Sequence, residues 1–278
     1  MPSSNARILM AARSRASVRG MSRFVRTLLT TSLSAAMARR TTFAMQAALM
    51  ALNNAIFFTF WVVLLRRVGT IRGYGLADVV VLYGVVAGGV GLAMILAGGV
   101  RQLARSIHEG ELDAVLSQPK PTLLYVLFRR SNPSGLGDLV SGCTMIALWG
   151  GVHLSAISVV ALAMVASAVV MVSCGVLFGS LAFWLGPVEA AARQLFELVI
   201  TFSLYPEPLF GGALRLLLFT LVPAGLVGYW PARVVRSPSI AGAVELAVVA
   251  AAYAAASAWV FARGLRTYCG GSRFELVG

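Results

Sequence analysis

The stretch LADVVVLYGVVAGGVGLAMILAGGV, residues 76–100, contains a single charged residue, Asp78. A helix needs about 20 mostly apolar residues to cross a hydrocarbon core that is roughly 30 Å thick. The stretch is long enough for one crossing and has no polar face to turn toward water. It therefore predicts a membrane-spanning helix in an all-α protein whose main solvent is lipid.

The rest of the chain has the same character. Of its 278 residues, 59% are hydrophobic and 12% are charged, and the mean hydropathy is +0.84, whereas soluble domains are about 25% charged. We predict a polytopic membrane helix bundle with one transmembrane domain, residues 42–263, and six transmembrane helices. The predicted spans are 42–65, 76–100, 138–154, 157–185, 187–204 and 240–263.

One further apolar run, 209–230, makes the number of spans ambiguous. A seventh span would put the basic carboxyl-terminal tail on the opposite side from the basic amino terminus, so six are favoured. Because Arg215 stands at its start and Pro223 interrupts it, the run is predicted to be a re-entrant segment before the last span. In the alternative, 209–230 crosses the membrane and 187–204 lies at the inner surface.

The net charge of +13 is concentrated at the amino terminus. Residues 1–41 are predicted to form a basic cytoplasmic arm, in which 21–40 is an amphipathic interfacial helix that lies on anionic lipid. This interpretation is favoured over nucleic-acid binding. The positive-inside rule then puts this arm and the 264–278 tail in the cytoplasm of a cell with a bacterial inner (plasma) membrane, although the 66–75 loop carries three arginines that count against it.

The chain has none of the sequence patterns expected of an enzyme. It has no phosphate-binding loop, no zinc-binding H-E-x-x-H, no G-x-S-x-G and only two histidines. We therefore predict no catalytic residue, metal or cofactor of its own, so that energy for transport must come from a partner or an ion gradient. The competing hypothesis is a membrane-embedded enzyme acting on a lipid-linked substrate.

Charged residues inside the spans are few. Glu189, Arg193 and Glu197 recur every four residues and share one helix face, with pairing between opposite charges. They are predicted either to line a substrate path or to form a self-neutralised stripe at a subunit seam or at the inner interface. Asp78, Asp138 and Glu245 fall near predicted span ends, from which their side chains can reach the interface.

The most polar stretch between two spans is RQLARSIHEGELDAVLSQP, residues 101–119. It is helically patterned, with a bend expected at Gly110 and a stop at Pro119. Such an amphipathic element across the ends of two spans is what a soluble motor would push on, whereas the alternative is an ordinary solvated loop. The candidate coupling residues are Arg101, Arg105, Ile107, His108, Glu109, Gly110, Glu111, Leu112, Asp113, Leu116 and Pro119.

Several short motifs add a resemblance to this picture. The segment from Ile107 to Pro119 reads I-x-x-G-x-L-D-x-x-L-x-x-P, and it is followed by Tyr205-Pro-Glu-Pro-Leu-Phe210, Leu214-Arg215 with Pro223, Tyr229-Trp-Pro231 and Gly264-Leu265-Arg266-x-Tyr268. In this order they resemble the permease subunits of type-2 ATP-binding-cassette (ABC) exporters. The likeness covers about residues 41–268.

That resemblance implies a six-span permease that works as a homodimer or a heterodimer with a second permease, and binds two cytoplasmic ABC ATPase subunits. It also implies that 101–119 is the coupling element between those ATPases and the spans. ATP would be bound by the partner subunits only. The resemblance does not indicate the cargo.

Overall fold

The computed structural model describes residues 23–38, 40–116, 121–153, 156–220 and 222–268. Within these ranges the chain is all-helical and has no strand, only an isolated bridge between Ile71 and Tyr74. Pro119, the arm up to residue 22, the tail beyond Tyr268 and the side chain of Arg215 lie outside the described part, so the predictions made for them are not addressed by it.

Four described helical stretches are long and apolar enough to cross a membrane: 40–68, 76–108, 157–185 and 240–267. A fifth is possible if the bent pair 212–220 and 225–236 forms one span. The predicted spans 138–154 and 187–204 correspond to α7 (Ser134–Trp149) and α10 (Glu189–Ser203), which have 16 and 15 residues. They are shorter than the others, so the count of six stays a prediction.

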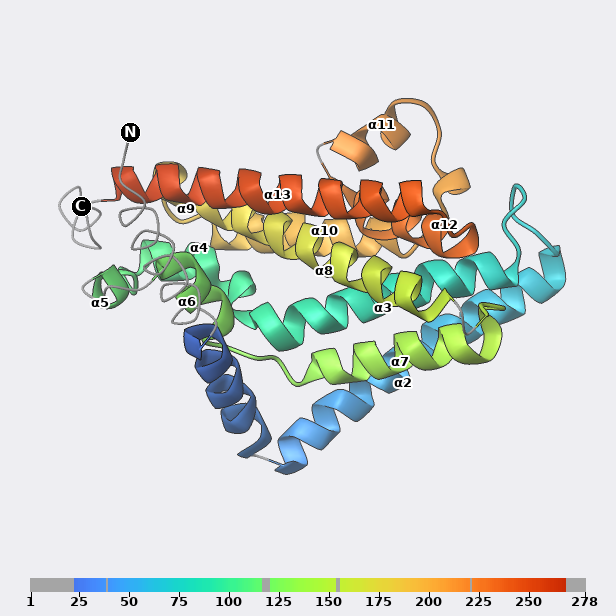
Figure 1. Ribbon diagram of the computed structural model, residues 1–278, viewed down its shortest axis with the longest axis horizontal. Coiled ribbons are helices and arrows are strands. Elements are labelled where there is room, and N and C mark those ends of the chain that lie inside the picture. The colour runs from blue at the N-terminus through green and yellow to red at the C-terminus, as the bar shows by residue number, and fades with distance from the viewer. Residues whose placement is uncertain (1–22, 39, 117–120, 154–155, 221, 269–278) are drawn as a thin grey trace, which may run out of the picture.

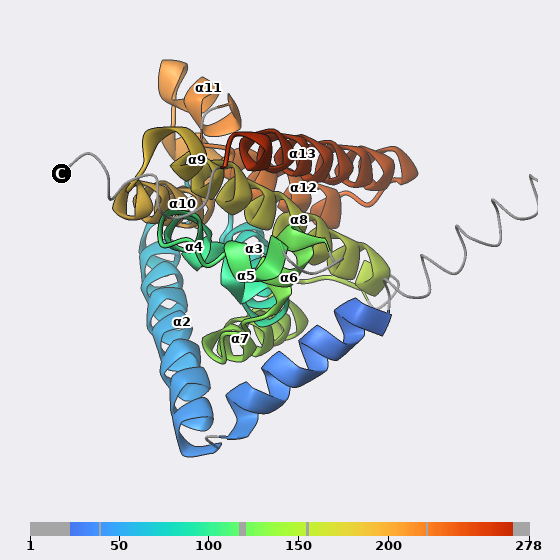
Figure 2. The same ribbon diagram turned by 90° about the vertical axis from the view of Figure 1, so that its left-hand side faces the viewer.

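The long helices lie side by side around a central one (Figures 1 and 2). Helix α3 (Leu76–Ala97) is covered by α2 (Arg40–Val68), α7, α8 (Ile157–Ser180) and α10, while α13 (Ile240–Thr267) packs on α8. The apolar residues of α3 are buried along most of its length, which explains why its sequence has no polar face. The neighbouring helices replace lipid as its surroundings.

Small residues allow the central helices to approach closely. A Cβ atom on Gly84 would lie 2.9 Å from the Gly142 carbonyl oxygen of α7, and one on Gly88 would meet the side chain of Met164 on α8. Gly84 and Gly88 are four residues apart, a small-xxx-small spacing that brings helices together, and here it serves packing inside this chain. By contrast, α2 and α13 expose large apolar side chains such as Ile56, Val248 and Trp259, as expected for helices at the rim of a membrane bundle.

The region between α10 and α13 is folded back on itself. It contains η3 (Glu207–Leu209), α11 (Gly212–Thr220), the π-helical turn η4 (Gly225–Tyr229) and α12 (Trp230–Arg236), and its two halves meet at 74°. Arg236 at its end pairs with Asp78 at the start of α3, at 2.8 Å, and donates to the Gly150 carbonyl after α7, at 3.2 Å. Buried Pro223 lies at the break, where it cannot continue the α11 ladder.

The helix of residues 23–38 runs across the long axis of the bundle rather than along it (Figure 1). Ser32 is its one buried side chain, while Leu33 and Met37 are exposed. The remaining short elements lie near the same end: η1 (Gly98–Gln102), α4 (Leu103–His108), α5 (Asp113–Leu116), α6 (Thr122–Phe128) and α9 (Ala182–Leu185).

Candidate functional site

The predicted coupling segment forms a compact cluster at one end of the bundle, built from η1, α4 and α5 and supported by α6. At Gly99 the backbone of η1 passes so close to α6 that a Cβ atom would collide with the Val126 carbonyl oxygen. Leu103 packs on Gly179 of α8. The Cβ atom of Leu103 lies 3.0 Å from the position that a Cβ atom on Gly179 would occupy. The segment is thus held against both neighbouring helices.

One side of the segment is part of the protein core. Leu103 and Leu112 are 0% exposed, Ile107 is 3% exposed and Val115 is 4% exposed. Leu116, another of the candidate coupling residues, is 43% exposed. Because burying such side chains is favourable by about 1.5–3 kcal/mol each, the segment is firmly anchored and is not an ordinary solvated loop.

Gly110 reverses the chain between α4 and α5. Its φ of +76° lies in the left-handed region, which side chains other than glycine rarely adopt. The Glu109 amide donates to the Arg105 carbonyl at 2.8 Å and closes α4, and the Asp113 amide donates to the Gly110 carbonyl at 3.1 Å and opens the next turn. The glycine therefore sets the direction in which α5 leaves the bundle.

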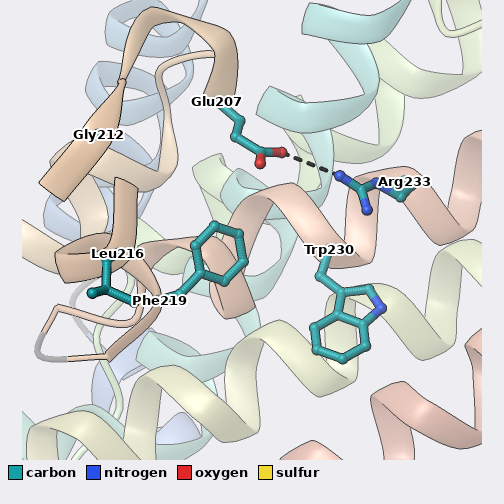
Figure 3. A pocket seen from close by; sticks show the side chains of 6 residues that line it. All are labelled: Glu207, Gly212, Leu216, Phe219, Trp230 and Arg233. Atoms are coloured by element: carbon teal, nitrogen blue, oxygen red, sulfur yellow. Dashed lines mark hydrogen bonds and ion pairs between the residues drawn. The ribbon is translucent and has the colours of Figure 1, made fainter. Parts of the chain in front are cut away.

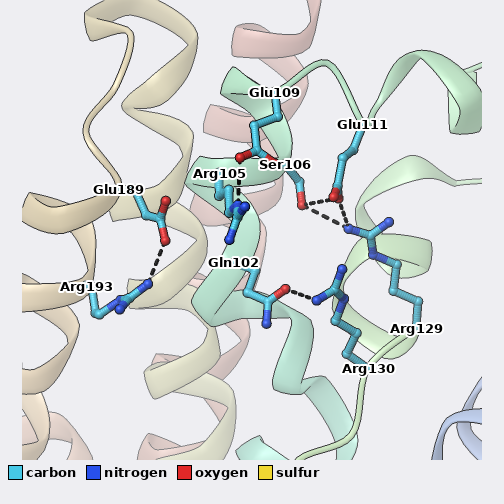
Figure 4. Close-up of polar contacts among 9 residues, drawn as sticks. All are labelled: Gln102, Arg105, Ser106, Glu109, Glu111, Arg129, Arg130, Glu189 and Arg193. Atoms are coloured by element: carbon cyan, nitrogen blue, oxygen red, sulfur yellow. Dashed lines mark hydrogen bonds and ion pairs between the residues drawn. The ribbon is translucent and has the colours of Figure 1, made fainter.

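Charged side chains cover the other side of the segment (Figure 4). Glu111 accepts from the Arg129 guanidinium and from the Ser106 hydroxyl, the latter at 2.8 Å, and Arg129 also donates to Ser106 at 2.9 Å. The hydrogen bond from Arg129, followed by that from Ser106, lowers the pKa of Glu111. Arg105 pairs with Glu109 at 2.7 Å.

The polar stripe of α10 reaches the same cluster. Glu189 pairs with Arg193 at 2.6 Å along the helix, as the spacing predicts, whereas Glu197 pairs with Arg101 of η1. Arg101 also lies over the ring of Phe196, 6.0 Å from its centroid. The two sets of residues singled out in the sequence, 101–119 and 189–197, are thus directly connected.

The end of α13 contributes one more contact to this cluster. Tyr268 lies 6.0 Å from Phe183 of α9, measured between ring centroids, and Gly264 leaves room for the same phenylalanine. Burial, and then the carboxylate of Asp113, raise the pKa of the Tyr268 phenol. The motif after the last span and the coupling turn therefore meet in space.

At the other end of the bundle, a cavity of about 530 Å³ lies beneath the folded-back segment (Figure 3). Its lining is mostly apolar but includes Glu207, whose side chain is 7% exposed and which pairs with Arg233 at 3.4 Å. Glu207 belongs to the Tyr205–Phe210 motif, and the sequence predicted no role for it. A carboxylate between two prolines in an apolar stretch was the available signal.

Asp138, which the sequence left without a role near a predicted span end, does not reach the membrane interface. Asp138 is 3% exposed and accepts from the Asn54 side-chain amide at 2.8 Å, and Asn54 in turn accepts from the Tyr83 hydroxyl at 2.8 Å. Helix α2 covers Asp138, because Gly137 lets the backbones of α2 and α7 approach closely.

Among the described residues, no three His, Cys, Asp or Glu side chains are grouped to hold a metal ion.

Comparison with known families identifies the chain. The family described as ABC-2 family transporter protein matches residues 51–272, which is most of the sequence. The chain belongs to this family, so it is a multi-pass membrane permease subunit of an ABC transporter. Neither the curated proteins nor the solved structures gave a match.

Proposed function

We propose that this permease subunit forms the substrate path of an exporter, as a dimer with a second copy or a paralogue, and that two separate cytoplasmic ATPase subunits drive it. The observation that carries the proposal is the coupling segment. Its buried leucines fix it to the bundle, and its charged side, with Glu109 and Asp113, is exposed at one end. A bound partner that contacts such a surface can transmit its own conformational change to the spans.

The proposed transmission runs through two contacts. Arg101 links η1 to Glu197 on α10, and Leu103 links α4 to Gly179 on α8. Closure of the ATPases around ATP would move 101–119 and, with it, the inner ends of both helices, so that the bundles rock around a shared path. In this mechanism Glu189, Arg193 and Glu197 act at the inner mouth of that path.

The proposal includes six spans: α2, α3, α7, α8, α10 and α13. At 1.5 Å per residue, α7 and α10 are about 22–24 Å long, and local thinning of the bilayer accommodates such a mismatch at small cost. The folded-back pair of α11 and α12 is then re-entrant, with residues 23–38 as an interfacial helix. Both chain ends are cytoplasmic in the plasma membrane.

Copurification tests the proposal. The tagged chain is extracted from its native membrane in mild detergent, its partners are identified by mass spectrometry, and ATP hydrolysis by the eluate is measured. We expect a stoichiometric ATPase with a phosphate-binding loop whose retention is lost when the charged side of 101–119 is replaced. Recovery of the chain alone, without ATPase activity, would contradict the proposal.

A further inference from the structure

A second cavity, distinct from the one beneath the folded-back segment, lies beside the coupling segment. It has a volume of about 410 Å³, is open on one side and is lined by the 23–38 helix, the start of α2, η1 and the connection between α6 and α7. This volume falls in the range of about 300–1,000 Å³ that is usual for small-ligand sites. The lining of the cavity includes Arg101, Arg129, Arg130, Ser32, Ala35 and Ser131.

The charge of this cavity is positive. Among the residues that the structure describes, three arginines and no acidic residue line it. Carboxylates outside the lining engage two of them, Arg101 through Glu197 and Arg129 through Glu111, while Arg130 donates to the neutral amide of Gln102. Arg130 is also near enough to Glu111 to help lower the pKa of that carboxyl group, so three arginines face two carboxylates and one positive charge is in excess.

Donor groups are also in excess. A guanidinium carries five N–H groups, and the contacts of Arg129 and Arg130 use only part of them, with Nε of Arg129 buried and without a hydrogen-bond partner. Phosphate oxygens match this geometry because they can accept two parallel N–H bonds from one arginine. Ser32 and Ser131 also line the cavity, but their hydroxyls donate to the Leu29 and Ile95 carbonyls, so the arginines are its free donors.

The position of the cavity selects the source of the phosphate. It lies at the end of the long spans, where headgroups of a bilayer begin, and one wall is the 23–38 helix with its exposed Leu33 and Met37. Basic pockets between helices at this level bind anionic headgroups. We propose that this cavity, termed the inner phosphate pocket, holds the headgroup phosphate of an anionic glycerophospholipid and fastens the 23–38 helix to the bundle.

This assignment requires that the bundle spans a membrane but does not rest on the ATPase partner. It can be tested by native mass spectrometry of the full chain, purified in mild detergent after reconstitution with phosphatidylglycerol and phosphatidylcholine. We expect retained phosphatidylglycerol. Arg130→Gln should reduce it about fivefold, since one arginine near such a surface contributes on that scale, and Arg130→Lys should be intermediate.

Two further variants separate lost binding from lost folding. Ala35→Trp fills the pocket from the helix wall without changing charge, and we expect it to reduce retention as Arg130→Gln does. Arg266→Gln removes an exposed charge from α13 at the same end and should retain the lipid fully. Equal retention in all variants would overturn the proposal. Binding of inorganic phosphate to the pocket with no retention of phosphatidylglycerol would overturn it as well.

Discussion

Arg101 of η1 is paired with Glu197 of α10, across 96 positions of sequence, and the two side chains are 37% and 38% exposed. The pair joins the coupling segment to the one helix whose sequence carries a polar stripe. Because both groups are partly solvated, the pair adds little to stability, about 0–1 kcal/mol. The main effect that we assign to the pair is therefore to link η1 to α10 rather than to stabilise the fold.

The first prediction concerns that connection. Glu197→Gln should change the melting temperature only slightly and should lower ATP hydrolysis by the assembled complex severalfold, because η1 no longer moves with α10. The charge exchange Arg101→Glu with Glu197→Arg should restore part of the activity. Glu245→Gln, an exposed charge on α13, is the matched control, and an equal loss in that variant would contradict the prediction.

The second prediction concerns the chain reversal at Gly110. Gly110→Ala forces a side chain into the left-handed region at a cost of about 1–2 kcal/mol, which should redirect α5 and abolish ATPase retention while membrane insertion stays normal. Gly69 has nearly the same φ, +78°, in the loop between α2 and α3. Gly69→Ala should leave ATPase retention intact, so loss in both variants would point to general misfolding.

The third prediction separates the two leucines of the coupling segment. Leu112 is fully buried, so Leu112→Ala should destabilise the protein by about 2–5 kcal/mol through the cavity it leaves. Leu116 is 43% exposed, and Leu116→Ala should change stability by less than about 1 kcal/mol. Unfolding of each variant in detergent measures both values.

The fourth prediction concerns pH. The pKa of Glu111 in the folded protein is below its ordinary value of 4.5 because of the hydrogen bonds from Arg129 and Ser106. The stabilising contribution is therefore complete above pH 4.5 and is lost as the pH falls toward the lowered pKa. Thermal unfolding followed into the acid range should show this loss in the wild type and a flatter profile in Arg129→Gln.

The fifth prediction concerns the buried contact between α2 and α7. Asn54→Leu leaves the Asp138 carboxylate and the Tyr83 hydroxyl without their partner, at a cost of about 1–3 kcal/mol for each unmet group. Asp138→Asn keeps an oxygen that can accept from Asn54 and should cost less. Equal stability of the Asn54→Leu variant and the wild type would show that the contact is not maintained in solution.

Hydropathy was sufficient to locate the longest helices. The first span was predicted at 42–65 and lies in α2, Arg40–Val68, and the last was predicted at 240–263 and lies in α13, Ile240–Thr267. Run length and apolar composition determine such helices locally. Helix α7 follows Pro133 and ends before Gly150, so its two bounds lie four and five residues before the predicted 138–154, whereas α10 agrees with the predicted 187–204 to within two residues.

The contacts of the candidate site were less accessible from the sequence. A spacing of four along α10 predicts the bond between Glu189 and Arg193, but the choice of Arg101 as partner for Glu197 depends on how helices pack. Asp138 could not be given a role for the same reason, because the side chain that satisfies it, Asn54, comes from α2. The arginines of the inner phosphate pocket come from η1 and from the end of α6. No local sequence pattern indicates that these two segments lie close together.

The central claim is that residues 101–119 face an ATPase. The most direct test places a photo-crosslinking amino acid at Ala114, which is exposed on α5, and at Thr70, which is exposed in the loop between α2 and α3. We expect irradiation of the native complex to join the ATPase to position 114 and not to position 70. An ATPase that copurifies but crosslinks at 70, or at neither position, would contradict it.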